Sequence, residues 1–304
     1  DPWINVPHLA DDNYITQLAT LIKNRLDPSL KVHIEYSNEV WNWGFSQAIY
    51  ARDQGDVLWP NPDGSGNSLW RARYNFYALR SHQIFDIFSS VFGGDERLVK
   101  ILGSQASLIS SAQEILACSY VITAGYRPGH AHCADVTALA IAPYFGGYIT
   151  SGAYINTVLS WVQESDGGLT SLFNEINNGG LTSQAPQGAL QAAFDNMSIN
   201  KSVSDQYGIQ LVAYEAGQHL GGNGGNNQAV IDLYNNANLD PRMGAAYEAY
   251  IDEWNTRSDN GIMAMFTHVK KNNNIGRWGL KQTQSSVNDP KWVAVMNKIA
   301  ENNL

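Results

Sequence analysis

The sequence is poor in positive charge. Of its 304 residues only 19 are Lys or Arg, against 28 Asp or Glu, which gives a formal net charge of −9. Proteins that bind nucleic acid normally rely on clustered cations to neutralise phosphates. The composition therefore argues against a nucleic-acid partner and favours an uncharged ligand.

The sequence also lacks long hydrophobic runs and short repeats. No stretch of about 18 apolar residues is present, so we expect no membrane span and no membrane partner. No fixed short period is visible, which argues against solenoids and propellers. A hydrophobic fraction of 44% with 15% charged residues is typical of a folded globular protein.

Cysteine is scarce, with Cys118 and Cys133 the only two in the chain. They either form one disulfide in an oxidising compartment or remain free thiols. The nearby His130 and His132 could bind a metal with Cys133, but a loop with a structural cysteine fits the spacing better. We expect no metal and no cofactor. Few Lys and many Asn, Gly, Ser and Gln are typical of exported enzymes, so we expect a secreted protein.

Short apolar runs recur along the chain, and each is followed by a helix-like stretch. This alternation is typical of β/α units with a parallel sheet. The six expected strands are Trp3–Pro7, Lys31–Ser37, Leu98–Gly103, Val136–Pro143, Ile209–Tyr214 and Ile262–His268. The expected helices are Asp12–Leu26, Arg71–Phe92, Ser110–Ala124, Tyr154–Glu164, Ala189–Tyr207, Asn227–Asn235, Pro241–Arg257 and Pro290–Glu301.

We expect one catalytic domain over residues 1–304. The stretch 146–208 is too long for a single connection between two strands of a compact domain. It therefore predicts an inserted helical or loop region beside the binding cleft.

Two glutamates follow apolar runs in the same way. Glu39 ends the segment that begins at Val32, and Glu215 ends the segment that begins at Ile209; polar residues follow each. In a β/α barrel, the carboxyl ends of the strands form the active-site face. Retaining glycoside hydrolysis needs two such carboxyl groups, about 5–5.5 Å apart.

The neighbours of these glutamates carry a resemblance to a known family. Ser37-Asn38-Glu39 after one strand, with Tyr214-Glu215 at the end of another, resembles glycoside hydrolase clan A. These are retaining β-glycosidases with a (β/α)8 barrel. The resemblance implies that Glu39 is the general acid/base and Glu215 the nucleophile, in an enzyme that cleaves β-linked poly- or oligosaccharides as an endo-β-glycanase does.

The resemblance also implies roles for further residues. Asn38 would hydrogen-bond the sugar 2-hydroxyl, and His8 would end the third barrel strand. Tyr144 would hydrogen-bond the nucleophile, and Trp278 would form the floor of the sugar subsite. Additional substrate-binding candidates at or beyond strand ends are Trp41, Gln105, His219 and His268.

If Lys31–Ser37 is the fourth barrel strand, this chain supplies about six β/α units, strands 3 to 8. Strands 1 and 2 are then expected from an upstream segment or from a companion chain. The alternative is a different strand register and an open α/β sheet.

Two other functions remain open at this point. A carbohydrate-binding protein could keep the barrel and its aromatic cleft without catalysis, although it would need neither Glu39 nor Glu215. A serine hydrolase would need a Gly-x-Ser-x-Gly turn directly after a strand. The nearest match, Gly64-Ser65-Gly66, has no strand before it.

Overall fold

The computed structural model describes residues 1–60, 69–222 and 224–301. Its contacts group into two compact units, and each is described by itself. Unit 1 comprises Asp1–Ile141 and Asn200–Val212; unit 2 comprises Ala142–Ile199 and Ala213–Leu304. The expectation of one catalytic domain over the whole chain stays a prediction.

The strands form a five-stranded sheet of the α/β class in which the spatial order follows the chain order. The pairs from β1 to β4 are parallel, with Trp3 opposite His33 and Val32 opposite Leu98. The strands are β1 (Trp3–Val6), β2 (Val32–Tyr36), β3 (Leu98–Gly103), β4 (Ala138–Ile141) and β5 (Gln210–Ala213). Each lies within one of the expected apolar runs. All five residues of β2 are buried, as in a sheet with both faces covered.

The sixth expected strand, Ile262–His268, is reduced to one bridge between Ala213 and Met263. The Ala213 N–H donates to the Ile262 carbonyl at 2.9 Å, and the Ala264 N–H donates to the Ala213 carbonyl at 2.9 Å. Further along, the Thr267 N–H donates to the carbonyl of Trp278 instead. The Phe266 N–H still donates to the Ala216 carbonyl at 3.0 Å, but Thr267 pairs with Trp278, and the pairing with β5 stays one bridge long.

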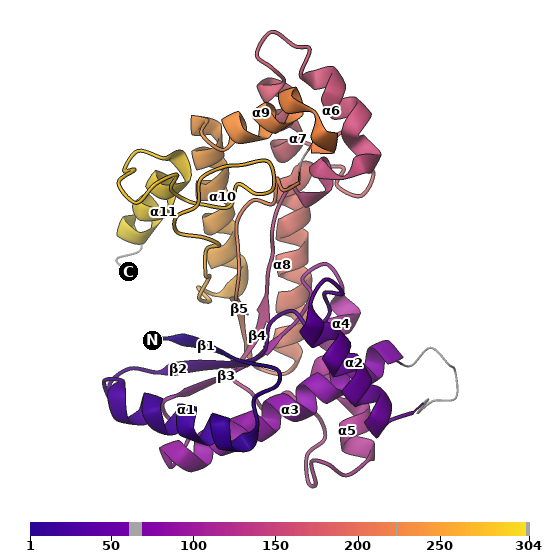
Figure 1. Cartoon of the computed structure of the whole chain (residues 1–304), viewed down its shortest axis with the longest axis vertical. Coiled ribbons are helices and arrows are strands. Elements are labelled where there is room, and N and C mark those ends of the chain that lie inside the picture. The colour runs from indigo at the N-terminus through magenta and orange to yellow at the C-terminus, as the bar shows by residue number, and fades with distance from the viewer. Residues whose placement is uncertain (61–68, 223, 302–304) are drawn as a thin grey trace. The chain divides into compact units, whose positions relative to one another are not determined.

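The helices of unit 1 pack against the sheet and one another: α3 packs on β2 and β3, and α1 packs on α3 (Figure 1). They are α1 (Asp12–Arg25), α2 (Ser46–Leu58), α3 (Leu69–Phe92), α4 (Ile109–Ala117) and α5 (Ser119–Thr123). Helix α1 begins as expected, where the Asp11 side chain accepts a hydrogen bond from the Tyr14 N–H at 2.7 Å. Its buried face carries Ile15 and Ala19.

Two features of unit 1 differ from the expectation. Helix α2 was not predicted, and the single helix expected over Ser110–Ala124 is two helices. Cys118 separates α4 from α5 with a left-handed φ of 40°. It also forms a disulfide with Cys133, which resolves the choice between bonded and free cysteines in favour of the bond.

Unit 2 consists mainly of helices and the loops between them (Figure 1). They are the 3-10 helices η1 (Gly147–Thr150), η2 (Gly152–Tyr154) and η3 (Gly224–Asn226), and the α-helices α6 (Ile155–Trp161), α7 (Leu169–Asn177), α8 (Gly188–Gln206), α9 (Gln228–Ala237), α10 (Pro241–Ser258) and α11 (Pro290–Glu301). Most of the stretch 146–208 is helical, and α7 was not expected as a separate helix. An insertion beside a binding cleft stays a prediction. The last turns of α8, from Asn200, belong to unit 1.

The core of unit 2 lies where α10 packs on α11. Tyr247, Tyr250 and Trp254 of α10 are fully buried. The Tyr250 hydroxyl donates to the Pro143 carbonyl at 2.9 Å, and the Trp254 ring N–H donates to the Gly261 carbonyl at 2.6 Å. These bonds satisfy the polar ends of large buried rings and join the middle and the C-terminal part of α10 to neighbouring segments.

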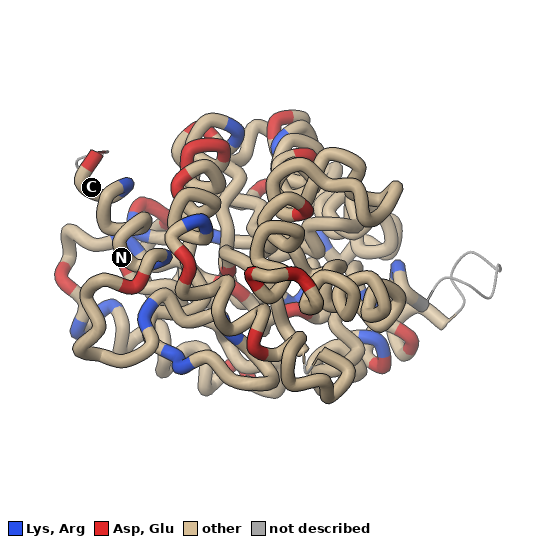
Figure 2. The backbone as a smooth tube through the Cα atoms, turned by 90° about the horizontal axis from the view of Figure 1, so that it is seen from above, with Lys and Arg blue, Asp and Glu red and all other residues tan. Residues whose placement is uncertain are grey.

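Charged residues of both signs are dispersed along the chain, with Lys and Arg spread among Asp and Glu (Figure 2). Among the described residues, no helix is both long enough and apolar enough to span a membrane.

Candidate functional site

The candidate residues of unit 1 follow the carboxyl ends of neighbouring parallel strands. His8 comes after β1, Asn38 and Glu39 after β2, and Gln105 after β3. The carboxyl ends of parallel strands lie at one edge of a sheet, which is where ligands bind in α/β proteins. The order of the strands therefore places these four residues at the same edge of unit 1.

Glu39 stands on an unusual backbone. It has a φ of 46°, and Ser37 two residues earlier has a φ of 61°. A non-glycine residue in this region costs on the order of 1–3 kcal/mol and persists only where its surroundings impose it. Here the Asn42 amide donates to Glu39 Oε2 at 2.8 Å, and the Gln47 amide donates to the Asn38 carbonyl at 2.8 Å. The half-buried Glu39 carboxylate is thus held by the loop that follows it.

Glu35 of β2 is a buried carboxylate that binds side chains of β1 near this edge. Its side chain is 1% exposed, and its Oε2 accepts hydrogen bonds from the Trp3 ring N–H at 2.9 Å and the Asn5 amide at 3.0 Å. The Asn5 amide also donates to the Ser37 carbonyl at 2.8 Å. Burial, together with the Glu35 carboxylate, raises the pKa of the adjacent Tyr77 hydroxyl well above its ordinary value. Glu35 therefore joins β1 to β2 and fixes the backbone just before Glu39.

Two tryptophans follow Glu39 and differ in exposure. Trp41 is buried, and its ring packs against Gly103, where a Cβ would approach it to 3.4 Å. Trp43 is 55% exposed, with the guanidinium of Arg73 at 4.3 Å from its ring centre. Trp41 therefore belongs to the packing of the strand end, whereas Trp43 presents aromatic surface to solvent.

His8 and Gln105 make other contacts at this edge. The His8 ring meets the Tyr50 ring edge-on at 5.3 Å, and the Gln105 backbone N–H donates to the Ser111 hydroxyl at 3.3 Å. Both residues are partly exposed, which leaves their side chains accessible.

In unit 2, four candidates form a connected group, here called the Glu215 cluster: Tyr144, Glu215, His219 and Trp278. The Tyr144 hydroxyl donates to Glu215 Oε2 at 3.0 Å. Backbone pairing aligns the segments that carry them, since the His219 N–H donates to the Phe145 carbonyl at 2.7 Å. The structure thus contains the tyrosine–glutamate hydrogen bond that the clan A resemblance implies.

The rings of the Glu215 cluster follow one another in space. Tyr144 meets His219 edge-on, with 5.1 Å between ring centres, and His219 meets Trp278 in the same way at 5.6 Å. The Lys270 ammonium lies 4.6 Å from the Trp278 ring centre. A half-buried carboxylate beside partly exposed rings can act on a ligand that has apolar faces and polar edges, such as a sugar.

His268 makes its ring contact outside the Glu215 cluster. It is exposed, and its ring packs on Trp292 at 5.3 Å. Although we expected it near the cleft, its ring contacts α11 rather than the Glu215 cluster.

Three buried polar residues beneath Trp278 were not among the candidates. Arg277 and Gln218 are 0% exposed, and Lys291 is 1% exposed. Little in the sequence pointed to them, since Arg, Lys and Gln are usually exposed. The one available hint was the position of Arg277 and Gln218 next to the candidates Trp278 and His219.

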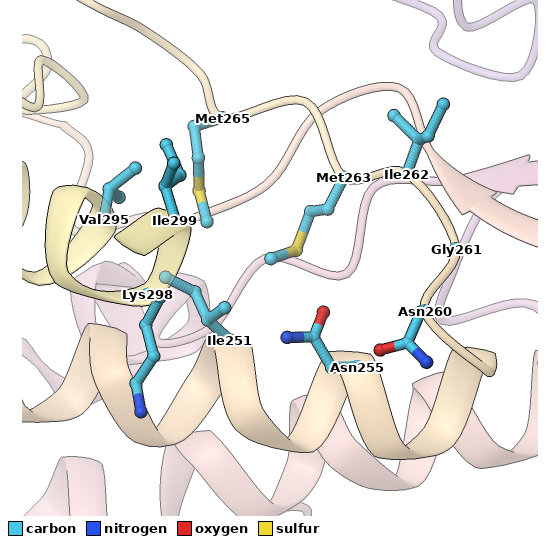
Figure 3. A pocket seen from close by; sticks show the side chains of 10 residues that line it. All are labelled: Ile251, Asn255, Asn260, Gly261, Ile262, Met263, Met265, Val295, Lys298 and Ile299. Carbon is cyan, nitrogen blue, oxygen red and sulfur yellow. The ribbon is translucent and has the colours of Figure 1, made fainter. Parts of the chain in front are cut away.

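A separate apolar pocket of about 550 Å³ lies between α10, α11 and the segment 260–265. Figure 3 shows Met263 and Met265 of that segment, with Ile251 on α10 and Val295 on α11 among the lining side chains. No candidate of the Glu215 cluster lines it.

The sequence also raised a metal site and a serine hydrolase as alternatives. No group of three or more His, Cys, Asp or Glu side chains that could hold a metal ion occurs there. Cys133 is bound in the disulfide, and His130 Nδ1 lies 3.2 Å from Asp135. The Gly64-Ser65-Gly66 segment considered for a serine hydrolase lies outside the described residues.

Comparison of the chain with protein-family models, with curated proteins and with solved structures gave no match. The case for a function therefore rests on the residues of the two strand-end groups and on their contacts.

Proposed function

We propose that this protein is a secreted retaining glycoside hydrolase that cleaves β-linked poly- or oligosaccharides. The observation that carries the proposal is the hydrogen bond from Tyr144 to Glu215 at 3.0 Å, beside the rings of His219 and Trp278. A tyrosine that donates to a carboxylate stabilises its ionised form, which a nucleophile requires. The Asn38-Glu39 pair after β2 supplies the second carboxyl group of the proposed mechanism.

The proposed reaction proceeds in two displacements. Glu39, protonated, donates to the glycosidic oxygen while the Glu215 carboxylate attacks the anomeric carbon, which gives a covalent glycosyl-enzyme. Glu39, now ionised, removes a proton from water, and the water displaces Glu215 from the sugar. Asn38 hydrogen-bonds the sugar 2-hydroxyl, a contact that strengthens in the transition state. The mechanism requires the two carboxyl groups to be about 5–5.5 Å apart.

The substrate class follows from the side chains around the carboxylates. Trp278 and Trp43 offer aromatic surface of the kind that packs against the C–H face of a sugar ring. The net charge of −9 favours a neutral glycan over a polyanionic one. The disulfide between Cys118 and Cys133 supports secretion, because such bonds persist in oxidising compartments.

We also propose that the sheet is part of a (β/α)8 barrel whose first two strands come from an upstream segment or a companion chain. Alternation along β1 turns the backbone groups of Trp3 and Asn5 away from β2, so they can pair with another strand. In unit 2, Ala213 bonds the backbone of Ile262 and Ala264. The backbone N–H and carbonyl of Met263, between them, therefore point away from Ala213. Full activity from the 304-residue chain alone, verified by intact mass, would overturn this part of the proposal.

The function is tested on a panel of soluble β-glucans, mannans and xylans with a reducing-sugar assay. We expect the wild-type protein to release reducing ends from at least one polymer. Glu39→Gln and Glu215→Gln should each lower kcat by several orders of magnitude, since each removes a group that reacts directly. Glu96→Gln, which changes an exposed carboxylate of unit 1, serves as the control and should retain full activity.

Azide separates the two roles. It should restore turnover of an activated aryl glycoside to Glu39→Ala, because a small nucleophile can replace the water that Glu39 activates. Binding of a glycan without hydrolysis by the wild-type protein would instead favour the non-catalytic carbohydrate-binding alternative. Near-normal activity of Glu215→Gln would contradict the proposed mechanism.

A further inference from the structure

A buried ammonium group lies beneath the segment that carries Trp278. Lys291 is in the first turn of α11 and is 1% exposed. Its Nζ donates to the Arg277 carbonyl at 2.6 Å and to Asn238 Oδ1 at 2.8 Å. Burial, opposed in part by the Asp289 carboxylate, lowers the pKa of Lys291 to about 7. The desolvation of this group is therefore costly, and its hydrogen bonds recover part of that cost.

The Arg277 carbonyl accepts a second hydrogen bond, from the Gln218 amide at 2.8 Å. Gln218 is the residue before His219, and its Oε1 accepts from the Leu220 N–H at 2.6 Å. One carbonyl thus joins three segments: the start of α11, the loop that follows Glu215, and the loop that carries Trp278.

The side chain of Arg277 reinforces the same connection. Its Nη1 donates to the carbonyls of Leu220 at 3.0 Å and Gly222 at 2.9 Å, and its Nε donates to Asn235 Oδ1 at 2.7 Å. Arg277 therefore binds the loop after Glu215 with its guanidinium, while its own backbone is held by Lys291 and Gln218.

Trp278 follows directly after this anchored carbonyl. Its ring lies over Gly276, where any Cβ would overlap the ring, and a Cβ on Gly221 would stand 3.4 Å from it. The Trp278 carbonyl accepts from the Thr267 N–H at 3.1 Å. Gly276 and Gly221 thus lie against the Trp278 ring. The orientation of the ring then depends on the position of the Arg277 backbone.

We propose that Lys291 is a positioning residue that acts through the Arg277 carbonyl to hold the Trp278 ring against His219, in the orientation that a sugar bound at Glu215 requires. The inference rests on the proposed function for its last step, the binding of sugar. Stability alone does not account for an ammonium here, because a buried apolar side chain of similar volume is often as stabilising or more so. A fixed carbonyl position, in contrast, needs a donor at this point.

The positioning is tested first without any ligand. In protein labelled with 5-fluorotryptophan, the Trp278 signal is identified among the nine tryptophans by its loss in Trp278→Phe. We expect Lys291→Met to shift or broaden this fluorine signal. The matched control is Lys281→Met, which also removes a buried lysine of unit 2 but one that donates to the Gln284 carbonyl, and it should leave the signal unchanged. An unchanged Trp278 signal in Lys291→Met would overturn the inference, whatever the protein binds.

The functional step is tested by a double-mutant cycle on the most active panel substrate. Lys291→Met and Trp278→Ala should each raise KM by about tenfold, and the double variant should be no worse than Trp278→Ala alone. A purely structural role would give additive effects, or a lower melting temperature with KM unchanged, and either result would contradict the proposal. If Lys291→Met does not fold, Gln218→Met removes the other donor to the same carbonyl and should give the same fluorine shift and the same coupling.

The two proposals fail in different ways. If no panel polymer is cleaved or bound by the wild-type protein, the glycosidase proposal fails. The fluorine signal still decides whether Lys291 fixes Trp278. If the wild-type protein is active and the cycle is additive, only the positioning role is lost.

Discussion

At the scale of single residues, the hydrogen bond from Tyr144 to Glu215 carries the proposed chemistry. The hydroxyl donates to Glu215 Oε2 at 3.0 Å, which in the proposed mechanism stabilises the ionised carboxylate. The ring of Tyr144 is held in turn by His219, at 5.1 Å between centres. Removing the hydroxyl while keeping the ring isolates the hydrogen bond from the packing.

If the proposed mechanism holds, Tyr144→Phe should lower kcat by about ten- to a hundredfold with a small change in KM, since the lost bond of about 1.5–3 kcal/mol acts on the proposed nucleophile. The measurement is steady-state kinetics on an aryl β-glycoside, with Tyr154→Phe as the control. Tyr154 bonds Thr182 rather than a carboxylate, so its loss should leave kcat unchanged. Equal kinetics for Tyr144→Phe and wild type would show that the bond has no part in catalysis.

At the scale of elements, the contact between α2 and α3 shows how small residues determine packing. Ala48, Ala51 and Gly55 form the buried face of α2. A Cβ on Gly55 would lie 2.5 Å from the backbone carbonyl of Ala72 on α3. The two helix backbones thus approach closely at Gly55.

Gly55→Ala should consequently destabilise the protein by about 1–3 kcal/mol through overpacking. Helix propensity alone predicts the opposite sign, a gain of about 0.5–1 kcal/mol from replacing a helical glycine. Chemical denaturation measures the difference. Gly152→Ala, where a Cβ meets open space at an ordinary φ, is the control and should be close to neutral. A stabilised Gly55→Ala variant would contradict the close packing of α2 on α3.

The same contact explains why α2 was missed in the sequence. A helix that buries alanine and glycine has no stripe of large apolar residues, and Phe45 at its start provides no side-chain cap. The strands were easier to predict, because runs such as Ala138–Ile141 are buried throughout and consist of apolar residues alone. The helix boundary at Cys118 depends on a left-handed residue and a disulfide partner in a distant loop, which local periodicity does not encode.

As with the helices and strands, only part of the candidate site could be predicted from the sequence. Glu39 and Glu215 stand out because each places a carboxylate where an apolar strand ends, and the family resemblance added Tyr144 and Trp278. The supporting residues were not predictable. Lys291 is far from Trp278 in sequence, and nothing in the pattern of α11 indicates that its first lysine is buried. Such support depends on how three segments meet, which only the tertiary structure defines.

At the scale of the whole molecule, buried neutral groups make folding stability depend on pH. Burial, reinforced by the nearby Arg127, lowers the pKa of His82 to about 4, although the Cys133 carbonyl and Asp135 oppose the shift. Burial disfavours the ionised form of Asp135, but the hydrogen bonds and charge of Arg127, together with His82, outweigh burial and lower the pKa of Asp135 to about 2. Asp135 thus stays ionised, while His82 stays neutral, over the range in which an unfolded histidine becomes protonated.

Stability should therefore fall as the pH decreases from about 6.5 to 4, because the unfolded chain binds a proton at His82 that the folded chain does not. The lowered pKa of His82 changes the free energy of unfolding by roughly 3 kcal/mol at most across this range. Urea denaturation across this range measures the slope, and His82→Gln, which lacks the titrating group, should show a shallower one. An identical slope in both proteins would exclude His82 as the cause of the acid sensitivity.

In the proposed mechanism, Glu215 is the residue that bonds covalently to the sugar. The most direct test is to treat the protein with 2-deoxy-2-fluoro-β-glycosides that carry a good leaving group, in the gluco, manno and xylo series, and to map the adduct by peptide mass spectrometry. The slow second displacement of such compounds should trap one glycosyl group per protein, attached to the peptide that contains Glu215. An adduct on any other carboxylate, or continued hydrolysis of a natural polymer by Glu215→Ala, would contradict it.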